Sequence, residues 1–176
     1  MPLFHEGKSP QQIIEETKKA IKAMPLRVAN LALNHFLKNF DTESWEGVKW
    51  KERSKDAPRN TGRKLLRDTG TLYKAMSKRV SGANVSVFIA PPADVYGAMH
   101  NTGGIITSSV SRQSKKFAWA MFLRTKNPMW KAMALQAVGT QRKVSIPKRR
   151  FMGDSPALNK KINTLIEQTI AKINGL

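Results

Sequence analysis

Apolar residues recur at helical spacing through residues 9–40. Ser9 and Pro10, followed by Gln12, have the pattern of a helix start in which Ser9 is the N-cap and Gln12 completes a capping box. Pro25 interrupts the pattern, and a proline inside a helix removes a backbone hydrogen bond. This segment therefore predicts two N-terminal helices, divided at Pro25. The apolar positions are Ile13, Ile14, Ala20, Ile21 and Met24 in the first helix, and Val28, Leu31, Ala32, Phe36 and Phe40 in the second.

Residues 41–64 are polar and charged, and they predict a long loop that contains Trp45 and Trp50. Two side chains of this size need contacts when a loop is this long. Two interpretations are open: the tryptophans fix the loop to the protein's own core, or they anchor a neighbouring subunit. His35, one residue from the preceding apolar stripe, is expected to be a surface or hydrogen-bonded half-buried side chain rather than a metal ligand.

The centre of the chain predicts short elements of both kinds. Residues 71–80 have the pattern of a short helix. Val85, Val87 and Ile89 then alternate with other residues in the manner of a half-buried strand, which Pro91 ends. A strand is therefore expected directly after this helix.

A second pair of elements follows. Asp94 predicts the cap of a short helix that carries Tyr96 and His100, and residues 101–104 predict a turn. Residues 105–110 predict another strand.

Residues 111–143 form an insertion rich in alanine, methionine and aromatic residues, which predicts either two short helices or a hairpin with mobile sides. Cationic, aromatic segments bind membranes or nucleic acid in some proteins, but we favour an insertion packed on its own domain. Residues 144–146 predict a short strand. Residues 155–174 predict a C-terminal helix that begins at a Ser-Pro pair. The apolar stripe of this helix comprises Leu158, Ile162, Leu165, Ile166, Ile170 and Ile173.

Together these elements predict a single α+β domain over residues 1–176. In it, N-terminal helices and a C-terminal helix surround a small, mostly antiparallel β-sheet, with long loops and an inserted segment.

The charge of the chain indicates what kind of partner it meets. There are 31 lysines and arginines against 12 acidic residues, a net charge of +19. Such an excess predicts an acidic partner, either nucleic acid or an acidic protein surface. The chain has no cysteine and three widely separated histidines, so no cofactor or metal site is expected. Neither a signal sequence nor a membrane span is expected from its hydropathy.

The triplet Asp68-Thr69-Gly70 is also found in aspartic proteases, which bring together two carboxylates that share one proton. Here Arg67 precedes the aspartate, and a neighbouring guanidinium would favour the ionised carboxylate. The chain has no second such triplet. We therefore expect Asp68 or Thr69 to cap a helix, Gly70 to permit a turn, and the protein not to be an enzyme.

Four motifs occur in order along the chain, and together they resemble the phage virion morphogenesis (tail-completion) family, to which tailed-phage neck proteins look related. The resemblance spans roughly residues 45–173. Gly97 stands where the family usually has alanine, and the insertion at 111–143 is longer than in compact members. The motifs are Trp45; Leu66, Thr69, Gly70 and Leu72; Tyr96, His100, Asn101 and Gly103; and Pro147, Arg149, Arg150, Phe151 and Gly153.

The resemblance implies a structural protein of a tailed phage or phage-like particle. It implies a subunit of a homo-oligomeric, hexameric ring at the head–tail junction, made in the bacterial cytoplasm and located in the virion neck or head-proximal tail. The partners would be other copies, connector, neck or tail-terminator proteins, and DNA in the channel. The alternative function is a basic nucleic-acid-binding protein.

Two sets of residues are candidates for contacts with partners. In a ring, Trp45, Trp50, Trp119 and Trp130 are candidate interface anchors, although an intramolecular core position is the alternative for each. Lys143, Lys148 and Arg149 are candidate contacts to DNA or an acidic partner, whereas we expect Arg150 to turn inward and position Phe151 and Gly153.

Overall fold

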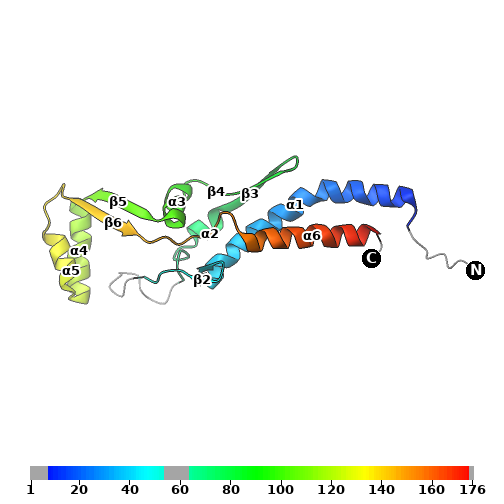
Figure 1. The fold of residues 1–176 in the computed structure, drawn as a ribbon. Coiled ribbons are helices and arrows are strands. Elements are labelled where there is room, and N and C mark those ends of the chain that lie inside the picture. The colour runs from blue at the N-terminus through cyan, green and yellow to red at the C-terminus, as the bar shows by residue number, and fades with distance from the viewer. Residues whose placement is uncertain (1–7, 54–63, 175–176) are drawn as a thin grey trace, which may run out of the picture.

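The computed structural model describes residues 8–53 and 64–174, which form an elongated α+β fold (Figure 1). Within these ranges the chain forms six helices and three antiparallel sheets of two strands each. The predicted α+β class is therefore confirmed. The strands are antiparallel throughout, but they are divided among three separate hairpins rather than joined in one sheet.

Helix α1 (Pro10–Thr42) begins at the predicted capping box, in which the side chains of Ser9 and Gln12 each accept a backbone hydrogen bond from the other residue. The prediction of two helices divided at Pro25 was wrong. The helix continues through this proline and bends part-way along its length (Figure 1), as helices do at proline. Tertiary contacts stabilise the helix just beyond Pro25, where Arg27 donates a 2.9 Å hydrogen bond to the Thr169 hydroxyl.

The segment predicted as a loop begins with a short hairpin of β1 (Ser44–Trp45) and β2 (Val48–Lys49). Residues 54–63 of that segment lie outside the described residues.

The prediction of a helix over residues 71–80 holds only for its first turn and was wrong for residues 76–80. Helix α2 (Thr71–Ala75) is followed directly by β3 (Met76–Ser81), which pairs antiparallel with β4 (Asn84–Ile89). Residues 76–81 form a strand despite their helical sequence pattern, because they pair with β4. Cross-strand pairing of this kind overrides local propensity. The strand predicted around residues 85–89 is confirmed.

Helix α3 (Asp94–Thr102) carries Tyr96 and His100, as predicted. The helix includes the first two residues of the expected turn, and it ends at the C-cap Gly103. Asp94 lies in the first turn, where a negative charge favours the helix, and the N-cap is the residue before it.

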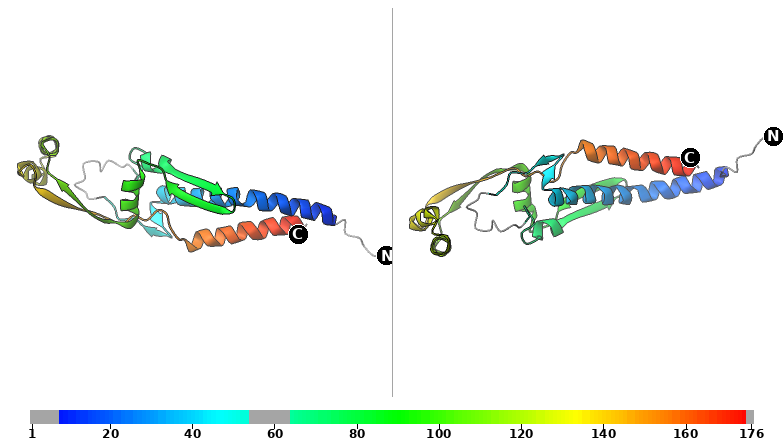
Figure 2. Two further views of the ribbon diagram at one scale, coloured as in Figure 1. Left: turned by 90° about the horizontal axis from the view of Figure 1, so that it is seen from above. Right: turned by 90° about the horizontal axis from the view of Figure 1, so that it is seen from below.

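Residues 104–146 form a structure that we call the arm. A ribbon of β5 (Gly104–Ser109) and β6 (Gln141–Ile146) carries at its end α4 (Arg112–Thr125) and α5 (Pro128–Leu135). For the insertion, the prediction of two short helices is therefore confirmed, rather than that of a hairpin with mobile sides. The expectation that the insertion packs on its own domain was wrong. Figures 1 and 2 show α4 and α5 at the end of the molecule opposite the start of α1.

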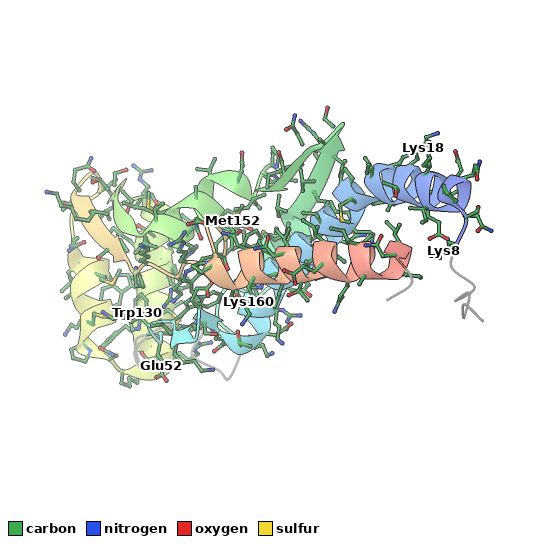
Figure 3. The ribbon with its side chains drawn as sticks, turned by 45° about the vertical axis from the view of Figure 1, so that its right-hand side comes forward. Lys8, Lys18, Glu52, Trp130, Met152 and Lys160 are labelled. Atoms are coloured by element: carbon green, nitrogen blue, oxygen red, sulfur yellow. The ribbon has the colours of Figure 1, made fainter. Side chains whose placement is uncertain are left out.

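The two helices at the end of the arm pack on each other around a small core of their own. Trp130, labelled in Figure 3, lies in this core, away from Met152 in the centre of the molecule. The buried residues of the core are Ala118, Met121, Trp130 and Ala134.

Helix α6 (Pro156–Asn174) begins as predicted and packs along α1. Lys8, just before α1, donates to the carbonyl oxygens of Lys172 and Ile173, so the start of α1 lies beside the end of α6 (Figure 3). Within the predicted apolar stripe of α6, Leu158 is buried, whereas Ile166 and Ile170 are solvent-exposed.

The main core lies where α1, α2, β3 and α6 meet. Its buried residues come from segments far apart in the sequence and are dominated by aromatic and aliphatic side chains. They are Ala32, Phe36, Phe40, Trp50, Leu65, Leu72, Met76, Ala93, Phe151 and Leu158.

Candidate functional site

The last sequence motif lies at the centre of the fold. We call residues 149–153, which connect β6 to α6, the strap. Phe151 is fully buried, with its ring centroid 4.9 Å from that of Phe40. Its carbonyl oxygen accepts a 3.0 Å hydrogen bond from the buried side chain of Asn39. The strap is therefore fixed to α1 by both its side chain and its backbone.

Asn101 in the last turn of α3 binds the strap from the other side. Its Oδ1 accepts from the backbone N–H groups of Phe151 and Met152, at 2.9 and 3.1 Å, and its Nδ2 donates to the Met152 carbonyl at 3.1 Å. The His100 carbonyl accepts from the Arg149 N–H at 2.8 Å. An amide side chain suits this position because it both donates and accepts. Two motifs distant in sequence thus form one hydrogen-bonded junction.

Arg150 contacts the hairpin that follows α1. Its guanidinium lies 4.5 Å from the ring centroid of Trp45 and donates a 3.0 Å hydrogen bond to the Asp154 carbonyl. Its own carbonyl accepts from Trp50 Nε1 at 2.7 Å. A Cβ at Gly153 would lie 2.6 Å from the guanidinium, so the glycine leaves space for it.

Arg149, predicted as a candidate contact to DNA or an acidic partner, is buried. The side chain is only 7% exposed, and it donates hydrogen bonds to the carbonyl oxygens of Lys51 (2.9 Å) and Glu52 (3.3 Å). Burial lowers the pKa of Arg149, and the charge of Arg53 lowers it further, opposed by Glu43. The candidate contact to DNA or an acidic partner is therefore wrong for Arg149, because its guanidinium is used inside the protein. Lys143 and Lys148 are exposed.

Gly103 permits a close approach between the end of α3 and Lys148, which lies between β6 and the strap. Its φ of +74° lies in the left-handed region, and a Cβ there would be 2.9 Å from the backbone nitrogen of Lys148. Backbone atoms cannot move aside as a flexible side chain can. Any side chain at this position would push the junction apart.

We expect Gly103→Ala to lower the free energy of unfolding by about 2–4 kcal/mol, because it combines left-handed strain with a backbone clash. Gly82→Ala is the matched control: Gly82 has φ +59° and open space around its Cβ position. It should cost only about 1 kcal/mol, from backbone strain alone. Urea denaturation measures both, and equal losses would show that the approach to Lys148 has no effect on stability.

The motif around Gly70 forms one wall of the junction. Leu65 and Leu72 are buried, and Leu66 is partly buried. Gly70, with φ +74°, is the N-cap of α2 and has no side chain that could cap the helix. The Thr69 hydroxyl accepts a 3.4 Å hydrogen bond from the N–H of Thr71, the first residue of α2, and lies 2.8 Å from the Thr71 hydroxyl. Of the two residues predicted to cap a helix, Thr69 is therefore the one that binds a free N–H group at its start.

Gly97 lets α3 pack closely against this wall. A Cβ at Gly97 would be 2.6 Å from Ile89 Cδ1 and 2.9 Å from Leu72 Cδ1. Glycine replaces the usual alanine at this position because the side chains of Ile89 on β4 and Leu72 on α2 fill the space that a Cβ would need.

A cavity of about 350 Å³ lies between this wall, α3 and Arg149. Among the described residues that line it, Asp68 is the one carboxylate, whereas Arg53 and Arg149 supply two cations. The two-carboxylate geometry of an aspartic protease is thus not found in the described residues of this cavity. No group of three His, Asp or Glu side chains suited to a metal ion occurs in residues 8–53 and 64–174.

Both described histidines disfavour protonation. Burial lowers the pKa of His100, and the charge of Arg149 adds to the effect. Burial also lowers the pKa of His35, with a further contribution from Lys161. His35 Nε2 lies within hydrogen-bond distance of Ser155 Oγ, at 3.0 Å, so this histidine is half-buried and hydrogen-bonded, as expected.

The four tryptophans occupy different environments. Trp50 and Trp130 are buried in the main core and the arm core, so their contacts are within the chain. Trp45 is partly buried and stacks on Phe36, with ring centroids 6.2 Å apart. Trp119, on the arm, is 38% exposed. Both loop tryptophans, Trp45 and Trp50, therefore pack on the protein's own core, which is the first of the two interpretations.

Two features of the site were not identified from the sequence. Asn39 stands on the buried face of α1 between Phe36 and Phe40, and a polar residue in that apolar stripe was the available signal. The second is the side chain of Ser155, which accepts from the Leu158 N–H at 3.1 Å and donates to Glu46. It links the start of α6 to the first hairpin.

The fold and junction define an elongated α+β protein in which the ordered motifs pack against one another. A family model described as the phage virion morphogenesis family matches residues 35–171. The chain belongs to this family, which confirms the resemblance and gives the protein a role in phage structure and morphogenesis. The search of curated proteins and that of solved structures each gave no significant match. None of the described helices is long and apolar enough to cross a bilayer.

Proposed function

We propose that the protein is a tail-completion or neck subunit that forms a ring at the head–tail junction of a tailed phage or phage-like particle. The observation that supports this most is the family match over residues 35–171, whose motifs gather at one junction. Asn101, Phe151 and Gly103 act inside the subunit, where they fix its shape. The protein acts through contacts with other proteins rather than through catalysis.

The ring contains several copies of the chain, and a hexamer fits a tail of sixfold symmetry. Its neighbours are connector, neck or tail-terminator proteins on either side. The net charge of +19 suits a subunit close to the DNA that passes through the channel. Lys143 and Lys148 are the exposed candidates for contact with DNA or with an acidic neighbouring ring.

Labelling of intact particles tests the position. Antibodies raised against the purified protein and coupled to gold should mark the neck or the head-proximal end of the tail in electron micrographs. Particles from a strain that lacks the gene control for unspecific labelling. Label over the capsid shell or at the distal end of the tail would contradict the proposed position.

A further inference from the structure

Most of the exposed large apolar side chains of the described residues lie at two ends of the molecule. One group lies on the arm. The other lies where the N-terminal half of α1, the end of α6 and the β3–β4 hairpin meet, at the opposite end of the molecule (Figure 1). Soluble monomers rarely expose large contiguous apolar surfaces, so both ends indicate contacts with partners.

The apolar surface of the arm is as large as one side of an ordinary interface. Its exposed large side chains are between 38% and 66% accessible. At about 150–250 Å² for a large side chain, they present on the order of 900 Å², against ~800 Å² per partner in a standard interface. They are Ile105, Ile106, Phe117, Trp119, Leu123, Met129, Leu135, Val138 and Val144.

The ribbon of the arm also lacks support within the subunit. Every residue of β5 is exposed, and β5 pairs only with β6 among the described strands. A two-stranded hairpin alone in water is marginally stable, and it gains stability from packing on another surface. A partner that covers the arm would therefore stabilise it.

The opposite end of the molecule contains a groove with apolar walls. The groove has a volume of about 520 Å³ and lies between α1, α6 and the tip of the β3–β4 hairpin. Ile21 and Ile170 line it and are 68% and 53% exposed. Met24, Val28 and Val85 also line the groove and are partly buried.

We infer that the end of the arm of one copy, centred on Leu123, docks into the groove of the next copy. This inference rests on the proposed ring and assigns the surfaces that build it. Because the arm and the groove are different surfaces at opposite ends, the contact is head-to-tail, and such contacts close into rings when the rotation between copies allows it. Leu123 lies beside Trp119 on the exposed side of α4, and both would be covered.

The chemistry of the arm favours another copy over DNA. Residues 111–143 carry eight lysines and arginines and no acidic residue, but aliphatic side chains stand among them. Phosphates pair with the cations and leave exposed leucines such as Leu123 and Leu135 uncovered, whereas the groove covers them.

The net charge gives this contact a salt dependence that separates it from the alternatives. Two copies of net charge +19 repel each other, so added salt screens the repulsion and strengthens an apolar contact between them. Binding to DNA or to an acidic protein weakens with salt.

Two surface variants of the full chain test the inference by sedimentation velocity at about 0.15 M and about 0.5 M salt. Leu123→Asp alters the arm, and Ile170→Asp alters the groove. Each alone should weaken self-association by at least about tenfold, since each places a charge in the apolar contact. Mixed in equal amounts, the two should form a heterodimer, because one intact arm and one intact groove remain.

Val95→Asp is the matched control, because Val95 is exposed on α3 outside both surfaces. It should assemble like the wild type, and circular dichroism should show that all three variants keep their helices. The inference is overturned if the wild type stays monomeric, if either variant assembles normally, or if the mixture stays monomeric. Self-association that salt weakens would also overturn it. These outcomes concern the arm and groove alone, whereas gold labelling of particles tests the position in the virion separately.

Discussion

Replacing Phe151 with alanine should lower the free energy of unfolding by about 3–5 kcal/mol, which is the usual range for a fully buried phenylalanine. The ring is inaccessible to solvent and packs on Phe40, and the residue's carbonyl holds the side chain of Asn39. Its loss leaves a cavity where α1, α3 and the strap meet. Urea denaturation followed by circular dichroism measures the loss.

Phe117→Ala provides the control for this experiment. It removes the same ring from a half-exposed position on the arm, where the edge contact with Trp130 is worth about 1 kcal/mol. The loss should therefore be several-fold smaller. If Phe151→Ala costs no more than Phe117→Ala, the strap is not the centre of the fold's stability.

Replacing Trp130 with alanine should unfold the end of the arm and leave the rest of the protein folded. Trp130 is the largest of the four buried side chains in the arm core, and its loss is worth about 3–5 kcal/mol. Such a small core cannot absorb this loss, whereas the main core has no contact with it. Hydrogen exchange should become fast in α4 and α5 and stay slow in α1 and α6.

Trp119→Ala is the matched control, because Trp119 lies on α4 and is partly exposed. It should leave exchange in both arm helices close to that of the wild type. Faster exchange in α1 or α6 of the Trp130 variant would mean that the arm and the main body unfold as one unit. Unchanged exchange in α4 would mean that Trp130 does not hold the arm together.

Elements with a strong local signal could be predicted from the sequence. The capping box at Ser9 and the Ser-Pro pair before α6 satisfy backbone groups at helix starts, so they act wherever the helix lies. The alternation in β4 likewise reflects one face packed and one face exposed. The motif order identified the family because it does not depend on the geometry of any one element.

Elements that depend on distant partners could not be predicted. The sequence of β3 has a helical pattern, and only its pairing with β4 makes it a strand. Pro25 breaks an isolated helix, but tertiary contacts such as that of Arg27 with Thr169 keep α1 continuous. Both corrections arise where packing outweighs local preference.

The directions in which neighbouring side chains of the strap point could not be predicted from the sequence either. Arg149 and Arg150 are adjacent in an extended segment, so they point to different sides. Which of them is buried depends on the carbonyl oxygens of residues 51 and 52, which lie about a hundred residues earlier in the chain. The groove was missed for the same reason, since its walls come from three separate segments.

The most direct test of the proposed function is electron microscopy of lysates from a phage that lacks the gene. The proposal predicts full heads and tails that fail to join, or tails with abnormal head-proximal ends, and a plasmid-borne copy of the gene should restore joined particles. Normal numbers of joined, infectious particles without the gene would contradict it.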